Sequence, residues 1–365
     1  MKRRELLTAA GLGLGAAALS GCRSDEPAVA GEGREQQRFR WRMVTSWPKN
    51  FPGLGTTAEY FSDLVNQLSG GRLQVQLFAA GELVPALEVF DAVAGGTAEL
   101  GHSAAYYWRG KTSAASFFTA VPFGLNAQEM NAWLYNAGGL ELWQKAYADF
   151  GVLPLPCGNT GVQMAGWFNR EINSLEDLRG LKMRIPGFGG EVMSRAGVTT
   201  VSIPGSEMFT ALQTGVIDAT EWVSPYNDLA FGLHQAAKYY YYPGWQEPCA
   251  VLELTINHRA FEQLPSDLQA VVRAAARATN QVMHDEYTLR NAEALATLVN
   301  QHQVQLRKLP DDVLNRLREL SAEVLEETAN RSDLNREIWD SMEAFRNKVW
   351  PSQALGEQAM YALRD

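Results

Sequence analysis

Four polar side chains lie in the largely apolar stretch 157–222 and could act together. Asn159 and Gln163 offer neutral amides. Arg184 carries a fixed, planar positive charge, and Glu221 adds one carboxylate. A guanidinium can hold an organic carboxylate through two parallel hydrogen bonds. A second carboxylate close by would repel such a ligand unless a cation lay between them. The set therefore indicates a pocket for a small carboxylate.

The sequence carries none of the common catalytic signatures. It has no metalloprotease His-Glu-x-x-His, no P-loop and no Gly-x-Ser-x-Gly. The glycine-rich run 187–190 lacks the third glycine of a dinucleotide site and is expected to form a tight turn into a helix over 191–196. The net charge of -9 argues against a nucleic-acid partner. We therefore expect a binding protein rather than an enzyme. Zinc is not expected either, because the histidines are scattered outside ligand spacing, at His102, His234, His258, His284 and His302.

The first 22 residues have the pattern of an export signal. Basic residues at 2–4 precede a short apolar run over 6–19, and the stretch 19–22 reads Leu-Ser-Gly-Cys. That ending resembles a bacterial lipobox, and Arg3-Arg4 resembles a twin-arginine signal. We expect periplasmic export with a lipid on Cys22; the alternative is a soluble protein cleaved nearby. Residues 23–38 have almost no large apolar side chain and are expected to form a flexible tether.

From residue 39 onward, strand and helix patterns alternate, which predicts an α/β fold. After Asn257 the pattern is almost wholly helical, with a capping box at Ser266 and Gln269. A last helix from Leu334 is expected to stop at Pro351. Strands are expected over 41–46, 73–77, 100–105, 163–169, 181–185, 219–223, 239–242 and 251–257. Earlier helices are expected over 61–68, 86–94, 127–148 and 208–212.

The chain is expected to leave a first domain near residue 158 and to return near residue 250. Two connecting strands would then lie side by side and would bring Cys157 and Cys249 into one region. An exported protein can form a disulfide, so we hypothesise one between these two cysteines. The alternative is a pair of small buried thiols.

Three stretches resemble a known family, the extracytoplasmic solute-binding proteins of tripartite ATP-independent periplasmic (TRAP) transporters of the DctP type. They are GNTGVQMAGWF at 158–168, LRGLKMRIPG at 178–187 and EMFTALQTGVIDATEW at 207–222. Their order and spacing make the resemblance specific. It extends from about Trp41 to beyond Asn257 and is strongest to the subgroup that binds 2-oxo acids such as pyruvate with a metal ion.

The resemblance implies two α/β domains joined by hinge strands, a long helix that spans both, and a cleft that closes over the ligand. Domain I would comprise 39–157 and 251–330, domain II 158–250, and residues 331–365 would form a C-terminal helical extension. Related oxo-acid binders use such an extension to pair two subunits, so we expect a possible homodimer held partly by 334–350. The alternative is a helix packed on its own domain.

The resemblance also implies roles for individual residues. Arg184 matches the arginine that grips the ligand carboxylate, and Asn159 matches a polar ligand contact. Gln163, Glu221 and the backbone of Trp222 match the cation ligands. Side chains expected to line the cleft more loosely are Trp47, Tyr106, Tyr107 and, near the metal, Glu247. Each has a plain structural alternative: a surface ion pair for Arg184 or Glu221, a solvent-facing strand position for Gln163, and core packing for the aromatic residues.

The charges agree with that assignment. Arg184 and Na⁺ would balance a monocarboxylate and Glu221, and a buried site strongly favours neutrality. Oxygen-only ligands suit a hard cation rather than zinc or copper. Ca²⁺ is the alternative ion, because an ionised Glu247 could balance its extra charge.

We therefore expect a protein that captures a small 2-oxo or 2-hydroxy monocarboxylate with a bridging cation and delivers it to TRAP membrane subunits. One alternative is a metal-free binder of larger sugar acids or dicarboxylates. A less favoured one is a periplasmic hydrolase or lyase that uses Glu221 as a general base. An apolar pocket discriminates between acids that differ by one methylene by only about 1–3 kcal/mol of binding free energy. The sequence therefore leaves the ligand's chain length open.

Overall fold

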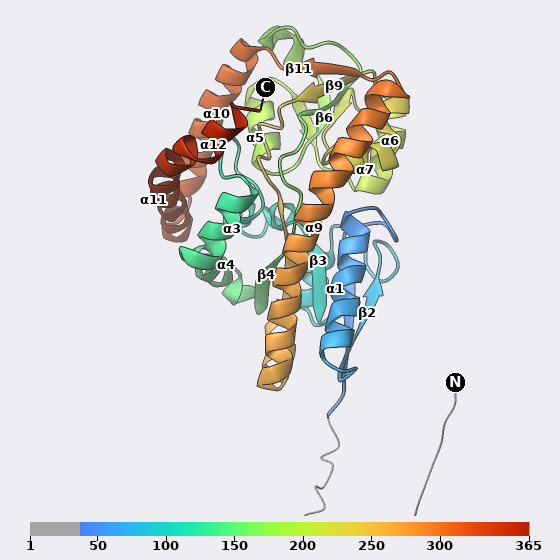
Figure 1. Ribbon diagram of the computed structural model, residues 1–365, viewed down its shortest axis with the longest axis vertical. Coiled ribbons are helices and arrows are strands. Elements are labelled where there is room, and N and C mark those ends of the chain that lie inside the picture. Colours follow the sequence, from blue (N-terminus) through green and yellow to red (C-terminus); the bar gives the residue numbers. More distant parts are fainter. Residues whose placement is uncertain (1–36, 365) are drawn as a thin grey trace, which may run out of the picture. The chain divides into compact units, whose positions relative to one another are not determined.

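Two β-sheets organise the chain (Figure 1). The structure is a computed structural model that describes residues 37–364, so the predicted signal (1–22) and nearly all of the predicted tether (23–38) lie outside the described residues. The α/β prediction is confirmed. Within 37–364, no helix combines the length and the apolarity needed to cross a bilayer.

The first sheet has five strands in the order β2-β1-β3-β10-β4. β1 pairs in parallel with β2 and β3, whereas β10 runs antiparallel to β3 and β4. Along β2, Leu73 and Val75 are buried while Gln74 and Gln76 are exposed, as alternation predicts. Its strands and nearby helices are β1 (Phe39–Thr45), α1 (Leu54–Leu68), β2 (Leu73–Phe78), α2 (Val89–Ala94), β3 (Leu100–Ser103), β4 (Val152–Asn159) and β10 (Val251–Asn257).

The second sheet has six short strands in the order β11-β9-β5-β8-β6-β7. β6 runs parallel to both β7 and β8, so the carboxyl ends of these three strands lie at one edge. Its strands are β5 (Gly166–Phe168), β6 (Lys182–Arg184), β7 (Thr199–Val201), β8 (Ala219–Thr220), β9 (Tyr239–Tyr242) and β11 (Gln305–Lys308). Helices between them are α5 (Gly187–Arg195), α6 (Gly205–Gln213) and α7 (Pro225–Ala230).

The chain passes from the first sheet to the second through β4 and returns through β10. These two strands are hydrogen-bonded neighbours, as predicted, and Val251 lies opposite Asn159. The predicted disulfide is wrong: Cys157 and Cys249 are both free, buried thiols. Cys157 packs with the apolar residues around Leu254, whereas Cys249 lies in a different cluster and its thiol faces the Leu125 carbonyl. Adjacent strands therefore do not bring these two side chains to the same face.

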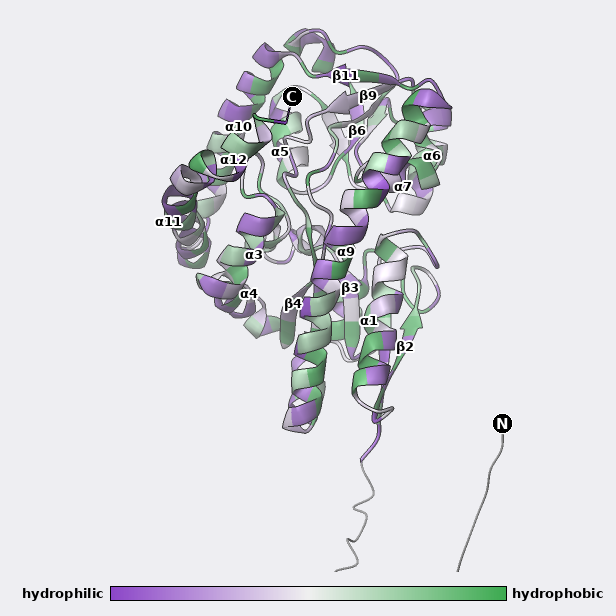
Figure 2. Cartoon of the chain, viewed as in Figure 1, coloured by the Kyte–Doolittle hydropathy of each residue, from purple (hydrophilic) through white to green (hydrophobic). Residues whose placement is uncertain are grey.

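Helix α9 (Ser266–Asn300) is the longest element and connects the surroundings of both sheets. Its 35 residues span about 50 Å at 1.5 Å per residue. It packs on β4 and α1 beside the first sheet and on α7 beside the second. Figure 2 shows apolar and polar residues mixed along its length, as expected for a helix with one buried side. Because the residues from Arg38 onward also pack as one compact unit, the division into domains at 158 and 250 stays a proposal.

Several predicted boundaries are wrong for identifiable reasons. The predicted helix over 127–148 is two helices, α3 (Ala127–Asn136) and α4 (Gly139–Tyr147), because Gly138 adopts a left-handed conformation with φ 87°. Pro351 does not stop the last helix but lies inside α11 (Asp333–Leu355). Ser266 is not a cap, since Pro265 occupies that position. β11 interrupts the predicted helical C-terminal part and pairs with β9. The predicted strand over 163–169 shortens to β5 and that over 219–223 to β8.

The remaining elements are short helices and the C-terminal helices. They are η1 (Ala105–Trp108), η2 (Ser113–Phe118), η3 (Ala148–Phe150), η4 (Leu175–Leu178), η5 (Leu233–Gln235), α8 (His258–Glu262), α10 (Asp311–Ala329) and α12 (Glu357–Tyr361).

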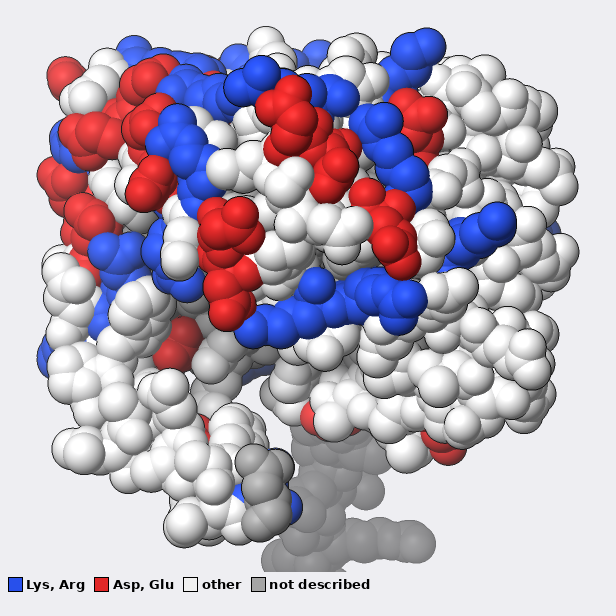
Figure 3. Space-filling view, turned by 90° about the horizontal axis from the view of Figure 1, so that it is seen from above, with Lys and Arg blue, Asp and Glu red and all other residues white. Residues whose placement is uncertain are grey.

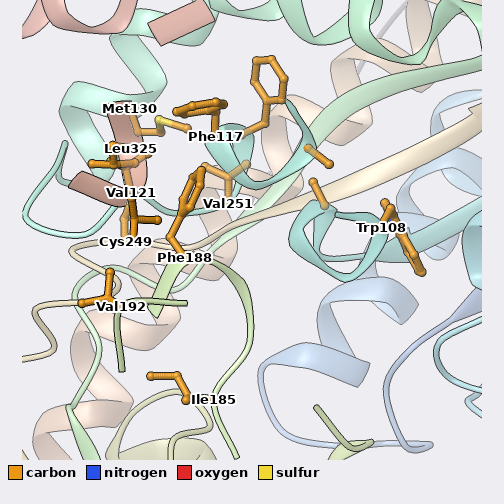
Figure 4. Close-up of a cluster of buried hydrophobic side chains, with 14 of the residues drawn as sticks. Trp108, Phe117, Val121, Met130, Ile185, Phe188, Val192, Cys249, Val251 and Leu325 are labelled. Atoms are coloured by element: carbon orange, nitrogen blue, oxygen red, sulfur yellow. The ribbon is translucent and has the colours of Figure 1, made fainter. Parts of the chain in front are cut away.

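One hydrophobic cluster draws on the surroundings of both sheets (Figure 4). Phe117 of η2 and Phe188 of α5 meet there with ring centroids 5.0 Å apart. Trp339 of α11 packs against the same Phe117 at 5.9 Å. The apolar face of α11 is therefore covered by its own chain, which is the alternative weighed for this helix.

Charged side chains of both signs are interspersed on the face shown in Figure 3, which looks onto the end of the molecule that carries β11. Among the C-terminal helices, Arg336 pairs with Glu326 at 2.7 Å and Arg316 pairs with Glu319 at 2.8 Å. Exposed pairs of this kind contribute about 0–1 kcal/mol each. They keep the surface polar, while the fold depends on the buried clusters.

A buried carboxyl on β10, one of the two strands that connect the sheets, should make the free energy of unfolding depend on pH. Glu253 of β10 accepts hydrogen bonds from the Trp108 indole and, at 3.0 Å, from the Tyr147 hydroxyl. Burial raises the pKa of Glu253 to about 8, against the lowering effect of these two donors. The folded state therefore binds this proton more tightly than the unfolded chain, and this contribution to stability falls as pH rises from about 4.5 to about 8.

We expect Glu253→Gln to be more stable than the parent protein at about pH 8, by up to a few kcal/mol, because one pKa unit corresponds to about 1.4 kcal/mol. At about pH 4 the two proteins should differ little. Urea unfolding at both pH values checks this, and an unchanged difference between them would contradict the assignment.

Candidate functional site

The site forms where β6 and β8 end side by side. Arg184, the last residue of β6, lies opposite Thr220 of β8, so Glu221 follows directly beside it. The Arg184 Nη1 donates to the Glu221 backbone oxygen at 2.5 Å and lies 3.3 Å from the carboxylate Oε2. Both side chains are fully buried. The surface ion pair considered for Arg184 and Glu221 is therefore wrong, because the pair lies in the interior.

Gln163 and Glu247 reach the same region from two loops. The Gln163 backbone N–H donates to the Glu247 carbonyl at 3.1 Å. The Gln163 amide also donates to Thr160 Oγ1 at 3.2 Å, and the side chain is buried rather than solvent-facing. The turn that holds this loop requires Gly244, since a Cβ there would lie 2.1 Å from the Gln163 carbonyl oxygen. Asn159, at the end of β4, accepts from the Gly161 N–H at 2.9 Å.

Six buried polar atoms of these predicted residues have no hydrogen-bond partner within the described chain. Three are oxygens that can accept or coordinate: Gln163 Oε1, Glu221 Oε1 and Glu247 Oε2. Three are N–H donors: Asn159 Nδ2, Arg184 Nε and Trp222 Nε1. A buried polar group without a partner costs about 1–3 kcal/mol, so such a cluster indicates a polar ligand. The donors suit an anion, and the oxygens suit a hard cation.

Trp222 and Trp47 form an aromatic wall across this polar cluster. The guanidinium of Arg184 lies 5.0 Å from the Trp222 ring centroid, and the Trp47 ring meets Trp222 edge-on at 6.2 Å. Trp47 follows β1 of the first sheet, so the wall joins groups from both sheets. Its indole N–H donates to His102 Nδ1 at 2.8 Å, and His102 Nε2 bonds the Cys157 carbonyl at 2.9 Å. Burial lowers the pKa of His102 to about 4, which keeps the ring neutral.

Tyr107 and Tyr106 bring the η1 segment against the same site. The Arg184 Nη2 lies 3.3 Å from the Tyr107 hydroxyl and donates to it. Tyr106 is buried and packs on Gly187 at the start of α5. Burial, followed by the charge of Glu247, raises the pKa of Tyr106, so its hydroxyl keeps its proton. Sequence reasoning missed two residues that support this site. They are His102, which bonds Trp47 and gave no signal because the histidines are scattered, and Gly244, which packs on Gln163.

The charges in this site do not balance among the side chains alone. Burial, then the neighbouring Glu247, raises the pKa of Glu221, while Arg184 opposes the shift. Burial likewise raises the pKa of Glu247 to about 8, again against Arg184. One guanidinium therefore faces two carboxyls. A bound cation would stabilise their ionised forms and lower both pKa values.

The oxygen atoms present fit a hard cation better than a transition metal. Within the residues that the structure describes, no three His, Cys, Asp or Glu side chains gather into a metal cluster. Carboxylate and amide oxygens nevertheless suit Na⁺ or Ca²⁺, and Glu221, Gln163 and Glu247 each bring an unpartnered oxygen of this kind to the cluster.

A cavity of about 360 Å³ lies beside the buried cluster and shares Tyr107 with it. Arg184, Gln163 and Glu221 are not on its wall, so it adjoins the site without containing it. Its lining includes Tyr106, Tyr107, Arg109, Ile185, Gly187 and Glu191.

A family comparison identifies the fold to which this site belongs. Residues 43–332 match the DctP model, described as bacterial extracellular solute-binding protein, family 7. The chain belongs to this family. It is a transport protein family rather than an enzyme family, and the two-domain architecture of its solved members accounts for the two sheets seen here.

Three similar proteins give this DctP-family chain its context. A monocarboxylate 2-oxoacid-binding periplasmic protein of Nostoc sp. is 43% identical over 357 residues, covering 98% of this chain and 97% of that protein. A TRAP periplasmic solute-binding protein of Pseudoalteromonas atlantica, solved with bound sodium and pyruvate, is 40% identical, with a TM-score of 0.88 over 90% of this chain and all of that one. A TRAP solute-binding protein of Bordetella bronchiseptica is 36% identical, with a TM-score of 0.88 over 90% of this chain and 97% of that one. It is described as a mixed-occupancy dimer with copurified calcium and picolinate.

Removing the buried guanidinium of this solute-binding protein should destabilise it in a pH-dependent way. We expect Arg184→Met to lower the free energy of unfolding by about 3–5 kcal/mol at about pH 8, because two buried carboxyls lose their counter-charge. The loss should shrink as the pH falls below about 8, because burial raises the pKa of both carboxyls and that of Glu247 to about 8, so protonation removes negative charge from the site. Urea unfolding of the ligand-free protein measures this.

The double variant Arg184→Met with Glu221→Gln is the matched control, since it removes both members of the buried ion pair and leaves only Glu247. It should recover part of the lost stability at the higher pH. Equal losses at both pH values, with no recovery, would mean that the pair is not electrostatically linked.

Proposed function

We propose that this DctP-family protein captures a small 2-oxo or 2-hydroxy monocarboxylate together with one cation and delivers it to TRAP membrane subunits. The observation that carries the proposal is the set of six unpartnered buried polar atoms, three donors and three acceptors, around Arg184 and Glu221. Two similar proteins support the ligand class. The Nostoc protein is named as a monocarboxylate 2-oxoacid-binding protein, and the Pseudoalteromonas protein was solved with bound pyruvate.

In this proposal each group has a defined task. The Arg184 fork and the Asn159 amide hold the carboxylate of the ligand, and the Trp222 and Trp47 rings form the apolar side. Glu221, Gln163 and the backbone of Trp222 hold the cation, with Glu247 nearby. The cation supplies positive charge between the ligand and the Glu221 carboxylate. Tyr106 and Tyr107 cover the site from the first sheet, and closure of the two domains excludes water.

Ligand and cation should bind as one linked pair. We expect pyruvate to bind roughly 5–150-fold more weakly to metal-stripped protein in sodium-free buffer than with Na⁺ or Ca²⁺ restored, the range typical of coupled sites. By linkage, pyruvate must raise the cation affinity by the same factor. Isothermal titration calorimetry of both orders of addition tests this.

The variant Glu247→Gln should distinguish whether the protein uses Ca²⁺ or Na⁺. An ionised Glu247 is needed to balance Ca²⁺ but not Na⁺, so the variant should lose affinity for Ca²⁺ much more than for Na⁺. Unchanged pyruvate affinity without any cation would refute the bridged arrangement and favour the metal-free alternative. Turnover of the acid on long incubation would instead favour the hydrolase or lyase alternative.

We further propose membrane anchoring through a lipid on Cys22 and a homodimer. The lipobox-like sequence supports the first, and mass spectrometry of the exported protein would detect the lipid. For the second, the support is a run of exposed apolar side chains after residue 350, at Leu355, Met360, Tyr361 and Leu363, and the dimer described for the Bordetella protein. Light scattering of the full chain and of a chain ending at 350 would distinguish a dimer from a monomer.

A further inference from the structure

A polar contact joins the surroundings of the two sheets at the rim of the site. Arg109 follows η1, which continues from β3 of the first sheet. Its Nη1 donates to the Gly187 carbonyl at 2.8 Å, and its Nη2 lies 3.8 Å from Glu191 Oε2. Gly187 and Glu191 belong to α5, which follows β6 of the second sheet. One arginine from the first side therefore holds a backbone and a side-chain oxygen of the second.

The contact lies next to the proposed ligand site. Arg109, Glu191 and Tyr107 all line the 360 Å³ cavity, and Tyr107 accepts a hydrogen bond from Arg184. Tyr107 thus contacts the arginine that would hold the ligand and lines the same cavity as the arginine at the rim. A motion that parts η1 from α5 would break the contacts of both arginines to the opposite side.

The approach of the two segments is close at this point. Gly187 has φ +62°, and a Cβ there would lie 3.2 Å from a ring carbon of Tyr106. A glycine tolerates both the backbone conformation and the short distance. Glu191 is held in place by Arg331 at 3.1 Å, while Arg195 lies farther from it, at 3.9 Å, and pairs more closely with Glu327 at 2.5 Å. It therefore presents a fixed carboxylate to Arg109.

We infer that Arg109 is a positioning residue that clasps the two sides of the cleft in the closed state and so slows dissociation of the ligand. The inference rests on the proposed function. Ligand can leave only when the cleft opens, so a contact made only in the closed state lowers the opening rate and leaves the entry rate nearly unchanged.

The contact of Arg109 with α5 is weak enough to form and break each time the cleft closes and opens. The Arg109 side chain is 49% exposed, so water screens its pairing with Glu191. A second set of closing contacts lies elsewhere at the boundary, where the Phe51 and Phe231 rings meet at 4.2 Å and the Asn227 amide donates to the Pro52 carbonyl at 2.6 Å. Loss of Arg109 should therefore loosen the closed state without unfolding the chain.

The test compares Arg109→Ala with Arg195→Ala in the full mature chain. Arg195 also pairs with Glu191 but lies on α5 itself, so its loss leaves the contact between the two sides in place. Stopped-flow tryptophan fluorescence with pyruvate and sodium chloride gives the association and dissociation rates. We expect Arg109→Ala to raise the dissociation rate roughly 3–10-fold, in line with one partly exposed hydrogen bond and a weak, screened ion pair. The association rate should change less than about twofold, and Arg195→Ala should resemble the parent protein.

An unchanged dissociation rate in Arg109→Ala would overturn the clasp. So would a slower association rate with an unchanged dissociation rate, because Arg109 would then only attract the anion. If the parent protein binds no 2-oxo acid, the proposed function fails, and hydrogen exchange of residues 104–110 decides the clasp separately. Faster exchange there in Arg109→Ala but not in Arg195→Ala would support it; equal exchange in all three proteins would overturn it.

Discussion

The burial of Arg184 beside two carboxyls is the constraint on which the rest of the site depends. An isolated buried guanidinium is costly, and so is an isolated buried carboxylate. Parallel pairing of β6 with β8 sets Arg184 next to Glu221, and the turn at Gly244 holds the Gln163 loop, whose backbone bonds Glu247, against them. The strands are only two and three residues long, so they act as a fixed frame for charge more than as a large sheet.

The same site also connects the two sheets. Trp222 packs edge-on against Trp47, and the Trp47 indole N–H donates a hydrogen bond to His102. His102 is in turn hydrogen-bonded to the carbonyl of Cys157 in β4. β4 is one of the two strands through which the chain passes between the sheets. The polar centre, the aromatic wall and the crossing strands therefore form one continuous set of contacts. In the proposed function, this continuity would let ligand binding influence how the two sides lie relative to each other.

Local patterns in the sequence predicted what depends on neighbouring residues. Alternation located β2, and the polar residues Arg184 and Glu221 in an otherwise apolar stretch, together with the family resemblance, were enough to predict that they lie in one region. Contacts between distant segments could not be predicted in that way. The break at Gly138 depends on a left-handed residue that helical periodicity does not register, and β11 is recognisable only through its pairing with β9. Adjacent strands suggested a disulfide, but the faces on which Cys157 and Cys249 lie depend on the register and the bulge between β4 and β10.

Charge neutrality explains how one site could serve with either of two ions. With Glu221 and Glu247 both ionised, Arg184 offsets only one of them, and a monocarboxylate adds a further negative charge. A divalent cation then restores neutrality. A monovalent cation does so if Glu247 keeps its proton, and burial raises the pKa of that carboxyl to about 8, so the protonated form is accessible near neutral pH. Sodium in one similar protein and calcium in another are thus compatible with a single arrangement that differs by one proton. A dicarboxylate would bring a charge that no described side chain in this cluster offsets, which argues against the metal-free binding of dicarboxylates.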